Sequence, residues 1–347
     1  MTVLEQFEKL VAEAYSKGAT DLHIRIGGEV WVRIGGNLRK DKKADFDTKL
    51  LQKLAAELLE EQERRILSSL KTVKGIREIS QELKFRYHFS FERSKLYMNV
   101  RLLPGRVRTW EMLDIPSLAL NFLNKKQGLI LISGPLSSGK TSTLASFTEY
   151  LNHNRREHII FIDEVVEHRV KSDRCIVNMR QLHSDTESYT TALKYALRED
   201  PDIIVLGEIN DAESAEIAIN IAETGHLVIA GVSTLGALNT VMRVLNCFPA
   251  RNLENARLKL SAYLIGIISQ VLIPDSSAKR LVPLFEVMTI TPSIANNIRS
   301  ERMNQLKAEF SRSVKGVSLC FEDCADQLKT KGLLPPTFDI SSLLRML

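Results

Sequence analysis

One short segment, Gly134 to Thr141, constrains the fold of this chain more than any other. It reads Gly-Pro-Leu-Ser-Ser-Gly-Lys-Thr, fits the pattern G-x-x-x-x-G-K-[ST], and stands between an apolar run and a helix-like segment. In that context the glycines let backbone N–H groups face a phosphate, and the helix presents its positive N-terminal end to the anion. The alternative, a glycine-rich turn with an accidental lysine, is disfavoured by the flanking strand and helix. The segment therefore predicts a phosphate-binding loop.

The polar residues of this loop have expected tasks. Lys140 would reach the β- and γ-phosphates of ATP, and the Thr141 hydroxyl would complete the coordination shell of Mg²⁺. The other loop residues expected to bind the nucleotide are Gly134, Ser137, Ser138, Gly139 and Ser142.

From Gly128 onward, short unbroken apolar runs alternate with helix-like segments. The runs span residues 129–133, 158–163, 202–208 and 226–234, and a further run spans 281–290. A buried parallel sheet with crossover helices has this pattern, because its strands are covered on both faces. Residues 128–291 are therefore predicted to form a doubly wound α/β nucleotide-binding core.

The residues before this core follow a different pattern. Apolar residues recur at helical spacing from Val3 to Ala14, and alternating strands are expected around 22–26, 30–34 and 85–103, with a helix near 48–68. These features predict a compact α+β domain at 1–104. The stretch 105–127, which opens on Gly105 directly after Pro104, is predicted to be a linker. Residues 292–347, helical by period, are predicted to form a C-terminal region.

Two of the apolar runs end in acids, which are candidates for running a hydrolysis. Asp163 and Glu164 end one run, and Glu208 ends another. Ligands of an open parallel sheet bind at the carboxyl ends of its strands, so these acids are expected to face the nucleotide. One would orient Mg²⁺ or its waters, and another would polarise the attacking water. For either site alone, an acid that merely starts a loop is an equally good interpretation.

Charge and cysteine content argue against several other classes. The 47 Lys and Arg residues and 42 Asp and Glu residues are interleaved, so the net charge of +5 does not indicate a nucleic-acid-binding face. Four cysteines are too few for a disulfide scaffold, and a reducing cytoplasm is expected. Cys320 and Cys324 are expected to be packing residues, because two thiolates do not complete a zinc shell. No apolar run reaches the roughly 18 residues of a membrane span, so any membrane role would run through partners.

Taken together, these residues resemble the PilT-like secretion ATPases, the hexameric motors that retract type IV pili. The resemblance covers nearly the whole chain. Besides the loop and the strand that ends in Asp163-Glu164, with Glu167 beyond it, the shared motifs are GATDLHIRIGG, ALREDPDIIVLGEI, AETGHLV, RVLNCFP and TPSIANNIRS.

The resemblance implies a PAS-like N-terminal domain joined to a RecA-like ATPase domain with nucleotide between them. It also implies ATP and Mg²⁺ as cofactors, hydrolysis of ATP coupled to mechanical work, and a homo-hexameric ring. The partner would be an inner-membrane platform protein of a type IV pilus machine, through which a cytoplasmic motor is held at the membrane. Whether a second pilus ATPase is also a partner stays open.

The resemblance also assigns roles to particular residues. Glu208 would be the Walker B acid and a ligand of Mg²⁺, His226 the first histidine of the family's His box, and Arg198 an arginine near the γ-phosphate. Three N-terminal arginines fall where family members place further arginines near that phosphate, and the sequence does not single out one: Arg86, Arg93 and Arg101. A planar guanidinium suits the charge of a phosphate.

The chain departs from the family pattern near the expected chemistry. Asp163-Glu164 inverts the usual Glu-Asp order, with Val165 in place of proline, so the sequence leaves open which acid activates water. The other departures are Ser233 for the second histidine of the His box, Asn210 for an arginine, and Ser137 for a loop glycine. They keep phosphate binding plausible and make a weakly hydrolysing accessory or regulatory ATPase an alternative to an active motor.

The direction of force rests on weaker features. The assembly-type relatives carry a tetracysteine zinc site that this sequence lacks, which favours retraction. SIANNIRS corresponds loosely to the C-terminal signature of the retraction class, with Ala295 where an arginine is usual. A related secretion or conjugation ATPase and a RecA-like nucleic-acid translocase are the remaining alternatives.

Overall fold

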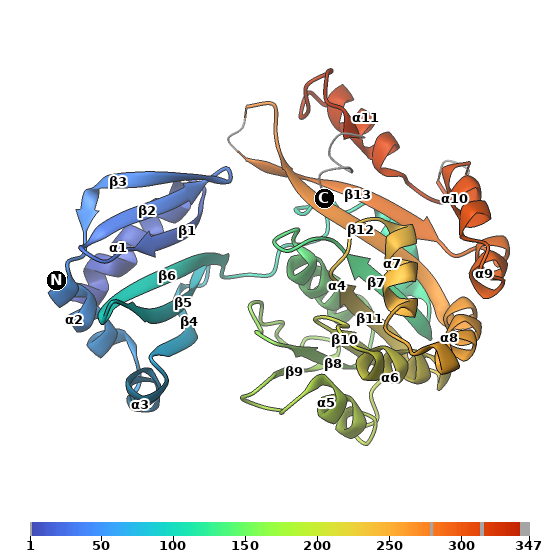
Figure 1. Ribbon diagram of the computed structural model, residues 1–347, viewed down its shortest axis with the longest axis horizontal. Coiled ribbons are helices and arrows are strands. Elements are labelled where there is room, and N and C mark those ends of the chain that lie inside the picture. Colours follow the sequence, from blue (N-terminus) through green and yellow to red (C-terminus); the bar gives the residue numbers. More distant parts are fainter. Residues whose placement is uncertain (1, 278–279, 313–315, 341–347) are drawn as a thin grey trace. The chain divides into compact units, whose positions relative to one another are not determined.

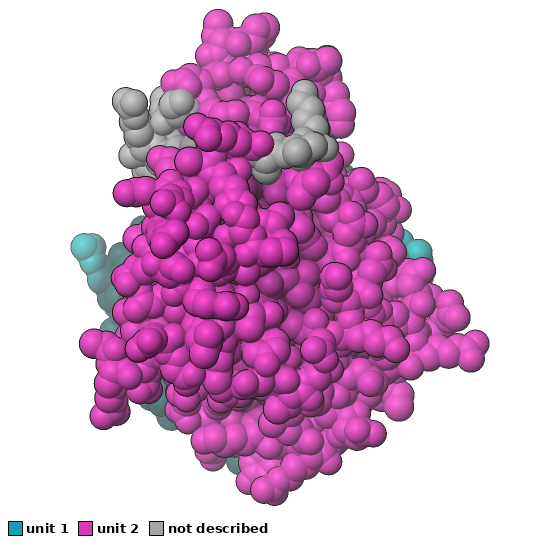
Figure 2. Space-filling model, turned by 90° about the vertical axis from the view of Figure 1, so that its right-hand side faces the viewer, with its two compact units in different colours: residues 1–106, 277–281 teal, residues 107–276, 282–347 magenta. Residues whose placement is uncertain are grey.

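The computed structural model describes residues 2–277, 280–312 and 316–340. The chain divides into two compact units (Figures 1 and 2): Met1–Arg106 with Ser277–Leu281, and Val107–Ser276 with Val282–Leu347. Of the C-terminal region predicted to be helical, residues 313–315 and 341–347 lie outside the described residues.

The N-terminal unit is built on an antiparallel sheet in the order β3-β2-β1-β6-β5-β4. Its elements are α1 (Val3–Ser16), β1 (Ala19–Ile24), β2 (Glu29–Ile34), β3 (Asn37–Asp45), α2 (Thr48–Leu58), α3 (Glu61–Leu70), β4 (Thr72–Ser80), β5 (Leu83–Glu92) and β6 (Lys95–Pro104). Helix α1 starts where the side chains of Thr2 and Glu5 form a capping box. Its buried residues Phe7, Val11 and Ala14 recur on one helical face, which packs onto the sheet.

Alternation along β5 gives this sheet two different faces. Phe85, Tyr87 and Phe89 are fully buried in the core of the unit. Arg86 and His88, one residue out of phase, point to the other face, because successive side chains of a strand point in opposite directions. One face of the sheet is therefore core, and the other carries polar and basic residues.

The second unit contains a sheet in the order β13-β12-β7-β11-β10-β8-β9, in which β12, β7, β11, β10, β8 and β9 are parallel (Figure 1). Its strands are β7 (Gly128–Ser133), β8 (His158–Asp163), β9 (Ile176–Gln181), β10 (Ile203–Leu206), β11 (Leu227–Val232), β12 (Leu264–Pro274) and β13 (Leu281–Thr289). Its helices are η1 (Ser117–Asn124), α4 (Lys140–Asn154), α5 (Tyr189–Ala196), α6 (Ala212–Glu223), α7 (Ala237–Leu245), α8 (Ala250–Tyr263), α9 (Pro292–Arg299), α10 (Met303–Ser311) and α11 (Phe321–Thr330).

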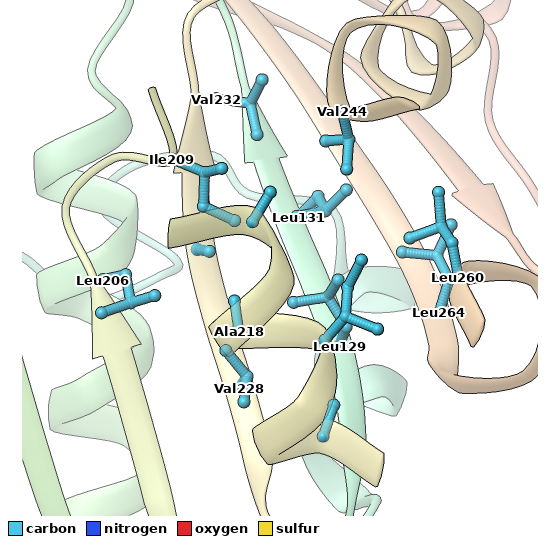
Figure 3. Packing of buried hydrophobic residues seen from close by; sticks show 14 of the residues in the cluster. Leu129, Leu131, Leu206, Ile209, Ala218, Val228, Val232, Val244, Leu260 and Leu264 are labelled. Atoms are coloured by element: carbon cyan, nitrogen blue, oxygen red, sulfur yellow. The ribbon is translucent and has the colours of Figure 1, made fainter. Parts of the chain in front are cut away.

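Helices cover both faces of this sheet. Leu129 and Leu131 of β7 point into a cluster shared with α5 to α10, part of which Figure 3 shows. Ile130 and Ile132, the alternate residues of the same strand, point into a second cluster with η1, α4 and α11. All six residues of β7 are buried, because a strand in the middle of a doubly covered sheet has no solvent-facing side. The prediction of an α/β nucleotide-binding core after an α+β domain is confirmed.

Helix η1 and strand β9 were not predicted from the sequence. Helix η1 lies within the stretch predicted to be a linker, and its Phe122 is buried in the core of the second unit. Strand β9 is absent from the predicted strands. It lies at one edge of the sheet, and its residues are exposed or half-buried and partly polar, so it has no unbroken apolar run.

No helix within the described residues combines the length and the apolarity needed to cross a membrane.

Candidate nucleotide site

The loop from Gly134 to Thr141 joins β7 to α4. Gly139 has φ +91°, and a Cβ placed on Gly134 would come within 2.3 Å of the Gln270 carbonyl oxygen, so both glycines of the motif are required by the backbone path. Ser137 has φ +62°, a left-handed conformation that is unfavourable for a serine. The structure therefore explains why a glycine at this position, as in the family pattern, suits the loop.

Lys140 is the first residue of α4, and its side chain folds back over the loop. Its ammonium group donates hydrogen bonds to the carbonyl oxygens of Gly134 at 2.8 Å and Pro135 at 3.1 Å. Burial lowers the pKa of Lys140 below its ordinary value, and the negative charge of Glu208 partly opposes that shift. The structure thus brings the loop lysine and the predicted Walker B acid into the same site.

The acids that end β8 and β10 lie at the same edge of the sheet as the loop. Leu206 of β10 is in register with Ile162 of β8 and Ala230 of β11, and Ala230 is in register with Leu131 of β7. Asp163 is the last residue of β8 and Glu208 comes two residues after β10, so both lie at the edge where β7 leads into the loop. This is the carboxyl edge, where ligands of such sheets bind.

Asp163 and Glu164, which the sequence did not separate, have different environments. One carboxylate oxygen of Asp163 accepts a hydrogen bond from the Glu164 backbone N–H at 2.7 Å and a longer one from the Tyr189 hydroxyl at 3.4 Å. The same oxygen lies 2.0 Å from where a Cβ on Gly207 would stand, so the carboxylate packs onto that glycine. Glu164 is exposed to solvent. The acid at the core of the site is therefore Asp163.

The surroundings of Asp163 change its acidity. Burial raises the pKa of its carboxyl to about 7, although the hydrogen bond from the Glu164 backbone works in the opposite direction and the charge of Glu167 adds to the increase. Burial, and next the charge of Asp163, raise the pKa of Tyr189 far above its usual range, so the phenol remains a donor. A carboxyl with a pKa near neutrality is suited to accept a proton during a reaction at physiological pH.

Motif reasoning did not assign a role to three residues that contact the loop or Asp163: Tyr189, Gly207 and Gln270. Gly207 directly precedes Glu208, and a glycine at a strand end signals a close approach of another group. Tyr189 and Gln270 carry no such signal, because their positions depend on which helix lies beside Asp163 and which strand lies beside the loop.

The N-terminal arginines differ in placement within their own unit. Arg86 and Arg101 are directly opposite each other on β5 and β6, on the polar face of the sheet. Like charges that are directly opposite each other repel, and a nearby acid or bound anion reduces this repulsion. Asp21, the residue opposite Arg101 on β1, is such an acid. Arg93 lies in the β5–β6 turn with φ +51° and so does not share their position on this face.

The structure does not bring His226 or Arg198 to the loop of their own chain. His226 directly precedes β11, and its Nδ1 contacts the Thr224 hydroxyl at 3.1 Å and the Ile221 carbonyl at 3.2 Å. Arg198 lies between α5 and the start of β10, with its guanidinium 5.5 Å from the Tyr195 ring centre. Both residues are at the amino edge, and a strand of the length of β11 separates the two edges by roughly 20 Å.

Within the described residues no group of three or more His, Cys, Asp and Glu side chains is arranged to hold a metal ion. Cys324 is buried, and its sulfur contacts the Phe285 backbone N–H, while the Cys320 thiol donates to Asp323. A divalent cation that arrives with a nucleotide differs from such a resident metal, because phosphate oxygens and water supply most of its ligands.

These features define a class. A buried parallel strand, a glycine-bounded loop, a lysine at the start of the following helix and acids on neighbouring strand ends together make a P-loop nucleotide-binding protein.

Comparison with known proteins gives the family. A family model described as "Type II/IV secretion system protein" matches residues 2–327. The chain therefore belongs to this family of secretion and pilus ATPases, which implies ATP binding, and the resemblance seen in the sequence is confirmed.

Individual relatives are similar over nearly the full length. The chain is 33% identical to the type IV pilus retractation ATPase PilT of Pseudomonas aeruginosa over 329 residues, which is 94% of each chain. It is 34% identical to the uncharacterized protein YggR of Escherichia coli over 299 residues, 86% of this chain and 90% of YggR.

Solved structures agree with these relatives. A crystal structure of the pilus retraction motor PilT with bound ADP matches with a TM-score of 0.83 and 33% identity, covering 95% of this chain and 94% of that one. The ATPase DotB of Legionella pneumophila matches with a TM-score of 0.83 at 18% identity over 97% of this chain and 94% of DotB, which shows a shared fold.

Proposed function

We propose that this protein is an ATP-hydrolysing motor that drives retraction of a type IV pilus. The observation that carries the proposal is the joint placement of Lys140, Glu208 and Asp163 at the carboxyl edge of the sheet, beside a loop whose two glycines the backbone path requires. The similarity to retraction ATPases over almost the whole chain supports pilus retraction as the process that the hydrolysis drives.

The chain's own groups suit the binding of a nucleoside triphosphate with Mg²⁺. Lys140 would exchange the carbonyl oxygens of Gly134 and Pro135 for phosphate oxygens, which attract an ammonium group more strongly. Thr141 and Glu208 have the oxygen donors that Mg²⁺ prefers, and the bound ion would neutralise charge on the phosphates.

Asp163 is proposed to be the acid that accepts a proton from the attacking water. It is partly buried, it is fixed by the Glu164 N–H and by packing on Gly207, and its pKa is close to neutrality. Glu164, by contrast, is exposed. Glu208 would orient the metal and its waters from the neighbouring strand.

The remaining assignments rest on the family resemblance. We propose residues 1–104 as a PAS-like domain and 128–291 as a RecA-like ATPase core, joined by 105–127 and followed by a C-terminal region at 292–347. Six copies would form a ring, and one or more of Arg86, Arg93 and Arg101 would approach a nucleotide. The pairing of Arg86 with Arg101 on one face of the sheet favours these two. The ring would act from the cytoplasm on an inner-membrane platform protein, with a second pilus ATPase as a further partner.

A weakly hydrolysing accessory ATPase is the second candidate, and specific residues favour it. Asp163 has a stem one methylene shorter than the glutamate of the family, while Ser233 and Asn210 replace a histidine and an arginine. A related secretion or conjugation ATPase would share the same nucleotide site.

Steady-state ATP hydrolysis by the purified protein tests the proposal. We expect turnover in the wild type and its loss in Lys140→Ala, Glu208→Gln and Asp163→Asn, with Glu164→Gln retaining most of it. Lys194→Ala is the matched control, because this lysine is exposed on α5 and forms a surface ion pair with Glu213. In cells, Lys140→Ala should abolish pilus retraction without loss of the folded protein.

Each outcome discriminates between the candidates. Tight ATP binding with negligible turnover in the wild type would favour the accessory ATPase. Unchanged retraction in Lys140→Ala would contradict the proposed motor, and a salt-dependent gel shift with single-stranded DNA would revive the nucleic-acid translocase.

A further inference from the structure

Gln270 lies buried next to the phosphate-binding loop. It follows Ser269, the last residue of β12 that pairs with β7, and the partner of Ser269 is Ser133, where the loop begins. Its side chain is only 2% exposed. The order of the strands, with β12 next to β7, therefore places an amide side chain beside the loop.

This amide bridges the loop and the helix that follows it. Nε2 of Gln270 donates a hydrogen bond to the Ser138 carbonyl oxygen at 2.8 Å, and Oε1 accepts one from the Thr143 hydroxyl at 2.8 Å. Ser138 and Thr143 are buried as well, so water cannot readily replace either bond.

The same residue lies against both glycines of the motif. A Cβ on Gly134 would stand 2.3 Å from the Gln270 carbonyl oxygen, and a Cβ on Gly139 would stand 3.2 Å from its Nε2. Gln270 therefore limits the space available to the loop at its beginning and near its end.

The bond to Ser138 fixes the direction of the next backbone N–H group. The peptide between Ser138 and Gly139 is trans, so its C=O and N–H point in opposite directions. Because the carbonyl is held toward β12, the Gly139 N–H points away from β12. We propose that Gln270 is a positioning residue, which holds this peptide in the orientation that offers the Gly139 N–H to a phosphate group. The inference rests on nucleotide binding at this loop, as proposed above.

Calorimetric titration with ADP tests the inference. Gln270→Met keeps the length of the side chain but removes both hydrogen bonds, and we expect it to weaken ADP binding about tenfold or more. Thr143→Val removes one bond of the bridge and should weaken binding by roughly threefold. Thr148→Val is the matched control on the same helix, because its buried hydroxyl donates to the Leu144 carbonyl of its own helix, and its ADP affinity should equal that of the wild type.

A pH profile separates positioning from a general loss of packing. In Gln270→Glu the new carboxyl lacks a donor toward Ser138 when it is ionised and regains one when it is protonated. We therefore expect its ADP affinity, relative to the wild type, to recover several-fold as the pH falls from about 8 to about 6.

Three results would overturn the inference. One is wild-type ADP affinity in Gln270→Met, and another is an equal loss of affinity in Thr148→Val and Thr143→Val. If Gln270→Met does not fold by circular dichroism, wild-type affinity in Thr143→Val overturns it. Absence of ADP binding by the wild type would instead refute the proposed function, and this inference with it.

Discussion

Asp163 is the residue whose protonation should control the rate of the reaction. Burial raises its pKa to about 7, and a base must lose its proton before it can accept one from water. Below that pKa, kcat/KM for ATP should therefore rise about tenfold per pH unit and then level off above about pH 8. Measurement with excess Mg²⁺ between about pH 5.5 and pH 8.5 checks this prediction.

Two variants identify the group responsible. Glu164→Gln should keep a profile of the same shape, with its midpoint moved slightly to lower pH because the charge of Glu164 contributes to the raised pKa of Asp163. Asp163→Asn should lower kcat by about 10²-fold to 10⁴-fold. A profile that is flat in the wild type, or that becomes flat in Glu164→Gln, would contradict the assignment.

At the level of single residues, the sequence was sufficient for the loop but not for its surroundings. Lys140 and its glycines form a contiguous pattern, so their geometry follows from local backbone rules. The choice between Asp163 and Glu164 depends on which one faces Gly207 and Tyr189, and those contacts join β8 to β10 and α5. Only the packed structure distinguishes adjacent acids that point in different directions.

Helix α7 depends on a carboxylate from a distant strand for its N-terminal cap. Its N-cap residue is Gly236, which has no side chain to accept a hydrogen bond, and Glu286 of β13 accepts one from the Ala237 N–H at 2.5 Å. Burial raises the pKa of Glu286 to about 7, against the effect of that hydrogen bond and with a small contribution from the charge of Glu322.

This carboxylate should make stability depend on pH. A carboxyl with a raised pKa in the folded state holds its proton more tightly there than in the unfolded chain, so its contribution is complete below about pH 4.5 and is lost as the pH rises through about 7. Glu286→Gln keeps a carbonyl acceptor for Ala237 and does not titrate. Its free energy of unfolding relative to the wild type should increase by about 2 kcal/mol from pH 5 to pH 8.

Urea unfolding of both proteins at these two pH values measures the difference. An equal stability difference at pH 5 and pH 8 would show that Glu286 does not titrate in this range.

A strand could be predicted from the sequence where its apolar run is unbroken, and burial alone was not sufficient. Strand β12 is buried along most of its length, but Ser269 and Gln270 interrupt its apolar residues, and it is absent from the predicted runs. Strands β7, β8, β10 and β11 are covered on both faces and appear as unbroken apolar runs. Strand β9 pairs with β8 on one side only, and polar residues such as Asn178 and Arg180 interrupt its apolar residues. An edge strand of this kind is defined by its hydrogen-bonding partner, which a local pattern does not reveal.

Each of the two units has its own hydrophobic core. In the N-terminal unit, Phe7 packs edge-on against Phe85 with ring centres 5.4 Å apart, and both are fully buried. We therefore expect residues 1–106 to fold as an isolated fragment with a single cooperative thermal transition. Phe85→Ala should destabilise it by about 3–5 kcal/mol, because a large buried side chain leaves a cavity.

Circular dichroism and thermal unfolding of the fragment check this expectation. Phe91→Ala is the control, because Phe91 is 39% exposed and should tolerate truncation with little change. A fragment without a cooperative transition would show that the N-terminal unit requires the rest of the chain.

At the scale of the whole molecule, the sequence motifs predicted the class of protein and the order of its domains, because the motifs are distributed over most of the sequence. The position of Arg198 and His226 could not be predicted in this way. The family resemblance assigned both residues to the nucleotide site, but Arg198 precedes β10 and His226 precedes β11, so both lie at the opposite edge of the sheet.

The bonds that Lys140 makes within its own loop mean that nucleotide binding is an exchange reaction. A ligand must first displace the ammonium group from the carbonyl oxygens of Gly134 and Pro135. A single phosphate forms few new contacts, whereas a di- or triphosphate can engage Lys140, the loop N–H groups and the N-terminus of α4 together. We therefore expect the loop to bind di- and triphosphates more tightly than a single phosphate ion.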